Sequence, residues 1–285
     1  MEQNLRKKTT ERQSDPLVAG GPVKQLLPVV LLVLIVSSCA PAPRITERPE
    51  SEVLSLACSI RLMMEDRKEV SNGFAAEADL SLSYPGADYS SEALIVGWRP
   101  ALLRIEYLGP FNQPVLSFAT DGHNFDLLSV LSMRYYEGTF SAPAVASFIP
   151  QGVRMEDLYC WLLGEYSFDD RRPVSFYTTG EPAVYVMQIY NERSGTGEEI
   201  WVDKQKEIIQ RVVVKNKAGD PVLTVQSGDF TEANGLYYPG IVSVLVPSVR
   251  LSLNMAYKKI DLLENKPSAA FTITCPPGFK HKTVN

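Results

Sequence analysis

Residues 73–86 read GFAAEADLSLSYPG, and this stretch decides the fold class because its apolar and polar side chains alternate. From Phe74 to Tyr84 every second residue is apolar, while the residues between them are small, acidic or hydroxylated. Side chains of a β-strand point to opposite faces in turn, so a period of two predicts a strand with one buried face and one hydrated face. The Pro-Gly pair that follows predicts a turn.

The same pattern recurs along most of the chain at the spacing of β-hairpins, which predicts an antiparallel meander. Asp121-Gly122 and Asn234-Gly235 mark tight turns within it. The further predicted strands are Glu92–Trp98, Leu102–Leu108, Pro114–Ala119, Phe125–Tyr135, Val174–Thr178, Ala183–Tyr190, Glu198–Val202, Ile208–Lys215, Pro221–Phe230, Tyr237–Val246, Leu251–Ile260 and Phe271–Thr274.

Three segments follow a helical period instead. Ser51–Glu65 carries one apolar stripe and begins with a serine that is suited to cap a helix. Two shorter stripes, 144–149 and 155–162, are separated by Pro150 and end at Gly164. The fold class is therefore mainly β with α. We expect about 11–13 strands that curl toward a barrel, because a flat sheet of that size is hard to maintain.

The N-terminal segment resembles a bacterial lipoprotein signal. Residues 26–39 read LLPVVLLVLIVSSC and follow a leader that contains five basic residues. Its roughly eleven apolar positions would reach about 17 Å as a helix, which is too short for a hydrocarbon core of about 30 Å. We expect residues 1–38 to be a signal peptide that is cleaved before Cys39, and Cys39 to be acylated. The alternative is an uncleaved anchor.

The residues after Cys39 refine this prediction. Residues 39–50 are rich in proline and poor in core-forming side chains, so they are expected to be a lipidated tether. In the Gram-negative lipoproteins that this pattern resembles, an aspartate after the cysteine favours the inner membrane, whereas here the residue is Ala40. We therefore expect a lipid anchor at the periplasmic face of the outer membrane. Residues 51–276 form the predicted domain, and 277–285 form a polar tail.

Composition argues against several classes of function. Without residues 1–38 the formal net charge is −7 and no basic run is present, so nucleic acid is not an expected partner. The chain has two histidines, His123 and His281, and no recognisable nucleophile, zinc or phosphate-binding motif. We expect neither catalysis nor a metal or cofactor. One disulfide with a free thiol, or three buried structural thiols, are both open for the remaining cysteines Cys58, Cys160 and Cys275.

Two stretches resemble the LolA/LolB-like superfamily, and most closely its outer-membrane lipoprotein receptors of the LolB type. Residues 93–112 read ALIVGWRPALLRIEYLGPFN, similar to two paired strands of which the second carries an arginine, here Arg104, before a loop. Residues 148–164 read FIPQGVRMEDLYCWLLG, similar to the family's helix-loop-helix. The loop departs from the pattern at Phe111 and Asn112, where leucine and glycine are usual.

This resemblance implies a half-open antiparallel β-barrel whose concave face is covered by about three short helices and encloses a cavity for acyl chains. Trp98, Leu158 and Trp161 are its candidate lining residues, and Phe111 is the candidate membrane-contact residue. The implied function is a lipid-anchored protein that receives lipid or lipoprotein acyl chains, with a periplasmic LolA-like carrier as partner. The alternative is an envelope sensing or scaffold module of the same fold without a transfer role.

Overall fold

A computed structural model describes residues 46–47, 50–70, 72–145, 149–150, 152–168, 171–179, 181, 183–191, 194–267 and 270–284. All of these belong to one structural unit, Arg44–Asn285. The predicted signal peptide 1–38, the lipidation site Cys39 and most of the tether 39–50 lie outside the described residues. They therefore stay predictions.

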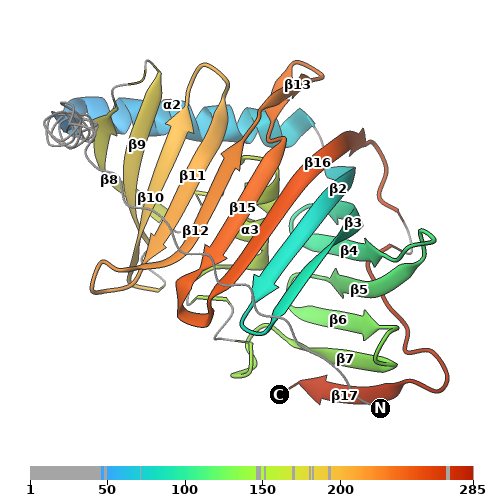
Figure 1. Cartoon of the computed structure of the whole chain (residues 1–285). Helices are drawn as coiled ribbons and strands as arrows, with labels where there is room; N and C mark the ends of the chain where they lie inside the picture. Colours follow the sequence, from blue (N-terminus) through green and yellow to red (C-terminus); the bar gives the residue numbers. More distant parts are fainter. Residues whose placement is uncertain are drawn as a thin grey trace, which may run out of the picture. The chain divides into compact units, whose positions relative to one another are not determined.

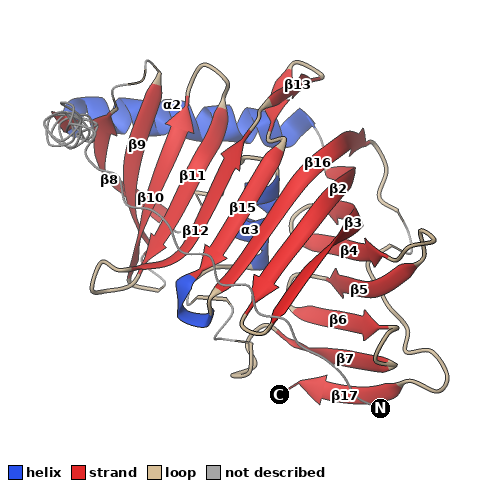
Figure 2. Ribbon diagram, in the orientation of Figure 1, coloured by secondary structure: helices blue, strands red, loops and turns tan. Residues whose placement is uncertain are grey.

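Two α-helices, one 3-10 helix and a long series of strands make up this described part of the chain (Figures 1 and 2). The elements are β1 (Thr46–Glu47), α2 (Glu50–Val70), β2 (Gly73–Tyr84), β3 (Ala87–Trp98), β4 (Leu102–Leu108), β5 (Pro114–Thr120), β6 (Asn124–Ser129), β7 (Arg134–Thr139), α3 (Met155–Leu162), β8 (Arg171–Thr178), β9 (Val184–Asn191), β10 (Thr196–Asp203), β11 (Ile208–Lys215), β12 (Pro221–Gly228), β13 (Thr231–Ala233), β14 (Leu236–Tyr238), β15 (Ile241–Val246), η1 (Pro247–Val249), β16 (Leu251–Leu263) and β17 (Lys280–Val284).

One sheet of 15 strands carries the fold, in the order β1-β8-β9-β10-β11-β12-β15-β16-β2-β3-β4-β5-β6-β7-β17. Its neighbouring strands are antiparallel except for β7 and β17, which are parallel. The sheet bends, so that β3–β7 lie at an angle to β8–β16 (Figure 1). β1 and β17 end the sheet and are not neighbours. The expected mainly β, antiparallel-rich fold is thus confirmed, but the described residues form an open curved sheet of 15 strands instead of a barrel of about 11–13.

Alternation decides which side of the sheet is buried. In β2, Phe74, Ala76, Ala78 and Leu80 are buried, whereas Glu77 points to solvent. We call the side that carries these buried residues and α3 the inner face, and the opposite side the outer face. The apolar positions that predicted β2 are therefore the same positions that pack in the core.

The first predicted helix is present and is longer than expected, because α2 covers Glu50–Val70 instead of Ser51–Glu65. It crosses the ends of β8–β12 (Figure 1). Lys204, in the β10–β11 turn, donates from its Nζ to the Oγ of Ser59 at 3.2 Å. Ile60 and Met64 on its apolar stripe are fully buried. The helix therefore covers one end of the core.

The middle of the chain contains one described helix where two were predicted. α3 agrees with the predicted stripe 155–162. The stripe 144–149 includes residues outside the described ranges, and its first residues, 144–145, close a turn in which Val145 N donates to Ala142 O at 2.9 Å. A stripe of six residues is short for a helix, because nucleation is costly. The described residues thus contain two α-helices instead of about three.

Two predicted strands are wrong because a turn divides each of them. Phe125–Tyr135 separates into β6 and β7 at a turn in which Met133, with φ of 50°, donates from its N–H to Val130 O at 3.2 Å. Tyr237–Val246 separates into β14 and β15 at Pro239. A proline has no N–H for the ladder, so it ends a strand that would otherwise continue.

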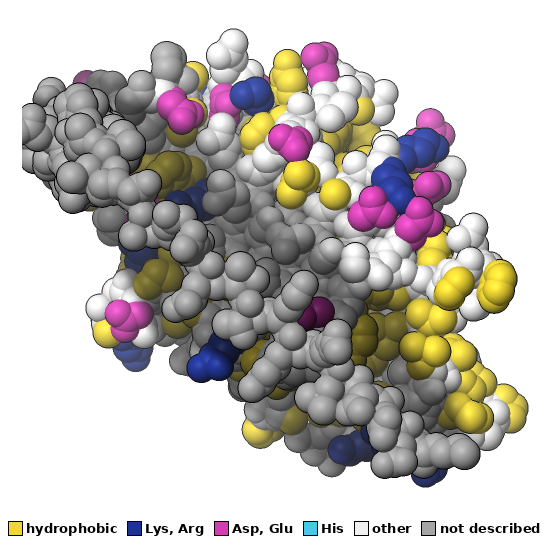
Figure 3. Space-filling view, in the orientation of Figure 1, with side chains coloured by type: hydrophobic (Ala, Val, Ile, Leu, Met, Phe, Trp, Pro, Cys, Tyr) yellow, Lys and Arg dark blue, Asp and Glu magenta, His cyan; other side chains and the backbone are white. Residues whose placement is uncertain are grey.

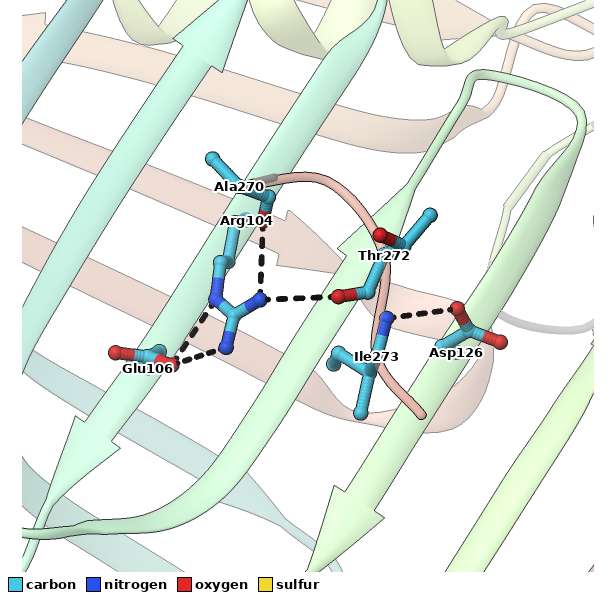
Figure 4. A network of polar contacts seen from close by, with 6 residues as sticks. All are labelled: Arg104, Glu106, Asp126, Ala270, Thr272 and Ile273. Carbon is cyan, nitrogen blue, oxygen red and sulfur yellow. Dashed lines mark hydrogen bonds and ion pairs between the residues drawn. The ribbon is translucent and has the colours of Figure 1, made fainter. Parts of the chain in front are cut away.

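The predicted strand Phe271–Thr274 is also wrong, since these residues cross the outer face of β4–β6 without ladder bonds (Figure 4). Arg104 on β4 donates from Nη1 to the carbonyl oxygens of Ala270 at 3.0 Å and Thr272 at 3.3 Å. Asp126 on β6 accepts the N–H of Ile273 at 3.3 Å. We call residues 270–276 the outer strap. It leads into β17, which lies within the predicted polar tail 277–285.

The three cysteines of the described chain are free thiols: Cys58 is exposed, Cys160 is buried and Cys275 is half-buried. A disulfide among them is therefore absent from this structure. Among the residues whose placement is described, no helix has the length and apolar character needed to cross a membrane.

Candidate functional site

An apolar cavity of about 400 Å³ lies between the inner face of the sheet and α3. This volume falls within the range of about 300–1,000 Å³ that small-molecule sites occupy. Every side chain that lines it is apolar. The lining residues are Leu103, Ile105, Phe118, Phe140, Ile149, Val153, Met155, Leu158, Trp161, Leu162, Leu223, Val225, Val242, Val244, Val246, Leu251, Leu253 and Met255.

Two central strands form the floor of this cavity. Val242, Val244 and Val246 alternate along β15, so all three point to the inner face. Val244 and Leu253 of the neighbouring β16 are half-buried, although both face inward. Their partial exposure arises because the cavity, and not another side chain, lies above them. The floor is thus an apolar surface that the chain itself leaves partly uncovered.

The roof is α3. Its first turn is capped by Asp157, whose carboxylate accepts the Arg154 N–H at 2.9 Å. Its end is set by Gly164, with φ of 69°, beyond which Glu165 N donates to Cys160 O at 2.8 Å. Only glycine adopts this left-handed conformation without strain. These contacts place α3 as a short, well-defined lid over the sheet.

Close approach of α3 to the sheet depends on Gly97 in β3. A Cβ at this position would overlap the rings of Phe74 and Tyr159. The two rings themselves pack with their centroids 5.6 Å apart. Glycine therefore allows the aromatic side chain of α3 to lie directly on β3, next to the cavity.

Two of the three predicted lining residues reach the cavity, and one does not. Leu158 and Trp161 of α3 both line the cavity, and Trp161 is only 2% exposed. Its indole N–H is buried and has no hydrogen-bond partner in the described part of the chain. Trp98 is not a lining residue: it lies beside Gly73 on the outer face of β3, because alternation turns Ile95 and Gly97 inward.

A second, more polar chamber of about 720 Å³ adjoins the apolar cavity. The two share Phe140, Ile149, Val153 and Met155. Its remaining lining residues include polar and charged ones, namely Asp121, His123, Ser141, Arg154 and Glu156. The apolar cavity therefore continues into a region that can hold a polar group.

A buried ionic cluster fixes the roof to the rest of the molecule. Glu165, just after α3, accepts a hydrogen bond from Arg99 Nη2 at 2.6 Å. Arg67 of α2 is 2% exposed and donates from Nη2 to the carbonyl oxygens of Leu163 at 3.3 Å and Tyr237 at 2.8 Å. One guanidinium thus links α2, the end of α3 and β14. Burial lowers the pKa of Arg67, and Glu165 partly offsets that effect.

The roof helix α3 also contains a buried thiol, Cys160. Burial raises the pKa of Cys160 to about 12, so its thiol stays protonated at neutral pH and is a poor nucleophile. Within the described ranges, no group of three or more His, Cys, Asp and Glu side chains is placed to hold a metal ion. The chemistry that this site offers is apolar enclosure next to polar groups.

Phe111 lies in a tight loop between β4 and β5 and is 88% exposed. Gly109 N donates to Gln113 O at 2.8 Å, and Asn112 adopts φ of 56°. These contacts hold the loop so that Phe111 does not fold back onto the sheet. Arg104, the other residue of the family pattern, points to the opposite face from the cavity and holds the outer strap.

Two parts of the site were missed from the sequence. The floor residues lie within predicted strands, so alternation in Val242–Val246 and Leu251–Met255 was a usable signal. The ionic cluster also left a trace, because Arg67 falls on the apolar stripe of α2 three residues after Met64. A charged residue on a core-facing stripe indicates a buried partner.

Comparisons with known proteins agree on the fold. No protein-family model matches the chain, and neither does any curated protein. Among solved structures, it is similar to a DUF1329 family protein from Desulfovibrio piger, with 13% identity, a TM-score of 0.57, and coverage of 77% of this chain and 97% of the other.

Two further structures are similar to the same extent. For an outer membrane lipoprotein-sorting protein domain from Vibrio parahaemolyticus, identity is 12%, the TM-score is 0.56, and coverage is 75% of this chain and 94% of the other. For a LolA superfamily protein from Nitrosomonas europaea, identity is 13%, the TM-score is 0.52, and coverage is 76% of this chain and 97% of the other. The described part of this chain therefore has a LolA-like fold.

Proposed function

We propose that the protein binds the acyl chains of lipids or lipoproteins in the cavity between the sheet and α3. The observation that carries this proposal is the uniformly apolar lining of a cavity of about 400 Å³, which the protein leaves unfilled. Interiors are normally packed to the density of organic crystals, so an unfilled apolar space of this size is suited to a ligand. The structures with which the chain shares its fold include a lipoprotein-sorting domain, which is consistent with such a ligand.

The energetics of acyl chains explain why such a cavity is useful. Each methylene buried from water contributes about 0.8 kcal/mol, so a chain of sixteen carbons costs roughly 13 kcal/mol when it is free in water. A cavity lined by Leu, Val and Phe offers the chain nearly the same environment as a bilayer. Transfer between the two can therefore proceed on small differences in affinity.

The polar chamber gives the ligand an orientation. The shared residues Phe140 and Met155 connect the apolar cavity to the side that carries His123 and Arg154. An acyl chain would occupy the inner cavity, and its ester or head group would lie toward these polar side chains. In this proposal the protein is a lipid-anchored, LolB-like receptor at the periplasmic face of the outer membrane. It accepts its cargo from a LolA-like carrier.

We expect a brominated fatty acid to quench the fluorescence of Trp161, because bromine quenches indoles only at close range and this ring lines the cavity. The protein of residues 44–285 would be titrated with the brominated acid while its emission is recorded. In Trp161→Phe most of the quenching should disappear, although binding of a dansyl-labelled fatty acid persists.

Trp98→Phe is the matched control, since that ring lies on the outer face. It should leave the bromine quenching nearly unchanged. Equal loss of quenching in both variants would contradict binding at the inner face. Absence of any fatty-acid binding would instead favour a sensing or scaffold module of the same fold.

We also propose that Phe111 enters the bilayer during delivery. Phe111→Glu should leave the thermal midpoint of the domain within about 2 °C, because a side chain that is 88% exposed makes few contacts. The same change should slow the movement of a fluorescent acyl chain from the protein to vesicles. Both quantities are measurable on residues 44–285. A fall of many degrees in the midpoint would show that Phe111 supports the fold and would remove the basis for this role.

A further inference from the structure

A second apolar tip lies beside the Phe111 loop. The turn between β6 and β7 carries Val130, Leu131 and Met133, which are 42%, 82% and 52% exposed. Turns are normally built from small and polar residues, so three large apolar side chains in four positions have no local explanation. Val130 N donates to Val115 O at 2.9 Å, which places this turn next to the first residues of β5. The two tips therefore project from the same edge.

The surface view agrees with this placement. Hydrophobic side chains gather at the edge of the molecule where the loops after β4 and β6 project, on the right of Figure 3. We call this edge, defined by Phe111, Val130, Leu131 and Met133, the apolar edge.

Basic side chains flank the apolar edge. β17 begins there, because Lys280 N donates to Met133 O at 2.9 Å. Lys280 is aligned with Arg134 and Lys282 with Tyr136, so Arg134, Lys280 and Lys282 share one face of the sheet. All three are exposed, and neither lysine forms an ion pair within the described chain. By strand register this is the inner face, the same face that Phe118 presents to the cavity.

We infer that the apolar edge and the basic residues of β17 together form a docking surface for a bilayer that contains anionic lipid. Apolar side chains at the tips of two turns can enter the acyl boundary, while lysine and arginine remain at the level of the phosphates. Anionic lipids attract each such basic residue. A protein partner would require a broad face of about 800 Å², which two turn tips do not supply. This inference rests on the proposed function only in that a carrier of acyl chains must reach a membrane.

Vesicle flotation of residues 44–285 tests the inference without any cavity ligand. The vesicles would be phosphatidylcholine alone, or phosphatidylcholine with about one third phosphatidylglycerol. The unmodified domain should bind the anionic vesicles more tightly, and added salt should weaken this preference. Lys280→Glu with Lys282→Glu should reduce binding to anionic vesicles by at least about tenfold.

Leu131→Glu should reduce binding to both kinds of vesicle by about tenfold, because it removes the apolar contact. The matched control is Leu245→Glu, on the outer face of β15, where an exposed leucine lies away from the edge. It should bind like the unmodified domain. Circular dichroism would confirm that each variant is folded.

Binding of a dansyl-labelled fatty acid would be measured for every variant. If Leu131→Glu and the double lysine variant float as well as the unmodified domain, the docking surface is wrong while the cavity proposal stands. If flotation behaves as expected but no variant binds the fatty acid, the cavity proposal fails and the docking surface stands. Equal weakening by Leu245→Glu would show nonspecific adsorption and would overturn the docking surface.

Discussion

Glu165→Gln is expected to destabilise the domain by about 3–5 kcal/mol, the largest change in stability that the structure predicts. The Glu165 side chain is 3% exposed and bonds to Arg99 at 2.6 Å. Its negative charge also acts on the buried Arg67. A neutral amide would leave two buried guanidinium groups without this carboxylate. Urea unfolding followed by circular dichroism measures the effect.

Glu156→Gln is the matched control, because Glu156 also pairs with an arginine, Arg154, at 3.1 Å. Its side chain is 36% exposed, and a pair in contact with water contributes only about 0–1 kcal/mol. In the double variant Glu165→Gln with Arg99→Met, part of the lost stability should return, because one of the two guanidinium charges that faced this carboxylate is removed. Equal destabilisation by Glu165→Gln and Glu156→Gln would show that burial of the cluster is unimportant.

Filling the cavity is expected to abolish most ligand binding. Val244→Trp places a large ring in the space above β15, where the valine is half-buried against the cavity. Excluding even two methylenes of a bound chain loses about 1.6 kcal/mol, so affinity for a dansyl-labelled fatty acid should fall at least about tenfold. The measurement is a fluorescence titration of the directly excited dansyl group.

The neighbouring Leu245→Trp is the control for this change. Leu245 lies one residue further along the same strand and points to the outer face. Its substitution should leave the affinity within about twofold. If Val244→Trp binds the fatty acid as tightly as the unmodified domain, the ligand does not occupy the space over β15. Thermal unfolding of both variants would separate loss of binding from loss of the fold.

The sequence predicted those strands that contain enough apolar side chains of their own to pack against the core. β2 follows the alternation of apolar residues, and β4 and β11 were predicted with their observed ends. β17 could not be found in this way. Its residues, KHKTV, have no apolar face, and it is held by a parallel ladder to β7 that only the folded chain brings into reach.

A strand that was predicted but is not formed also depends on contacts with distant parts of the chain. Phe271–Thr274 has the composition of a strand, yet its backbone is bound by the side chains of Arg104 and Asp126 instead of by a neighbouring strand. Similarly, Val130 to Met133 is apolar enough to continue a strand but forms a turn. Composition predicts which residues will be buried and which favour the extended backbone of a β-strand. It does not show which polar group will meet each backbone amide.

Cavity residues were predictable where apolar side chains recur at the helical period of 3.6 residues. Leu158 and Trp161 lie on an amphipathic stripe, and both reach the cavity. Trp98 could not be placed from its sequence, because both faces of β3 near its end are apolar and either could have pointed inward. The ionic cluster depends on the pairing of α2 with residues nearly a hundred positions away, such as Leu163, and no local pattern specifies that pairing.

The pairing of β17 with β7 has a consequence for biosynthesis. Glu137 and Thr283, which meet across this pair, are 146 residues apart in the chain. Until that late segment is made, the open edge of β7 presents unpaired amides and carbonyls to any other extended chain. Every newly made molecule therefore passes through an interval in which it is open to self-association. A chaperone that binds extended, unpaired strands during synthesis would protect this protein most in that interval.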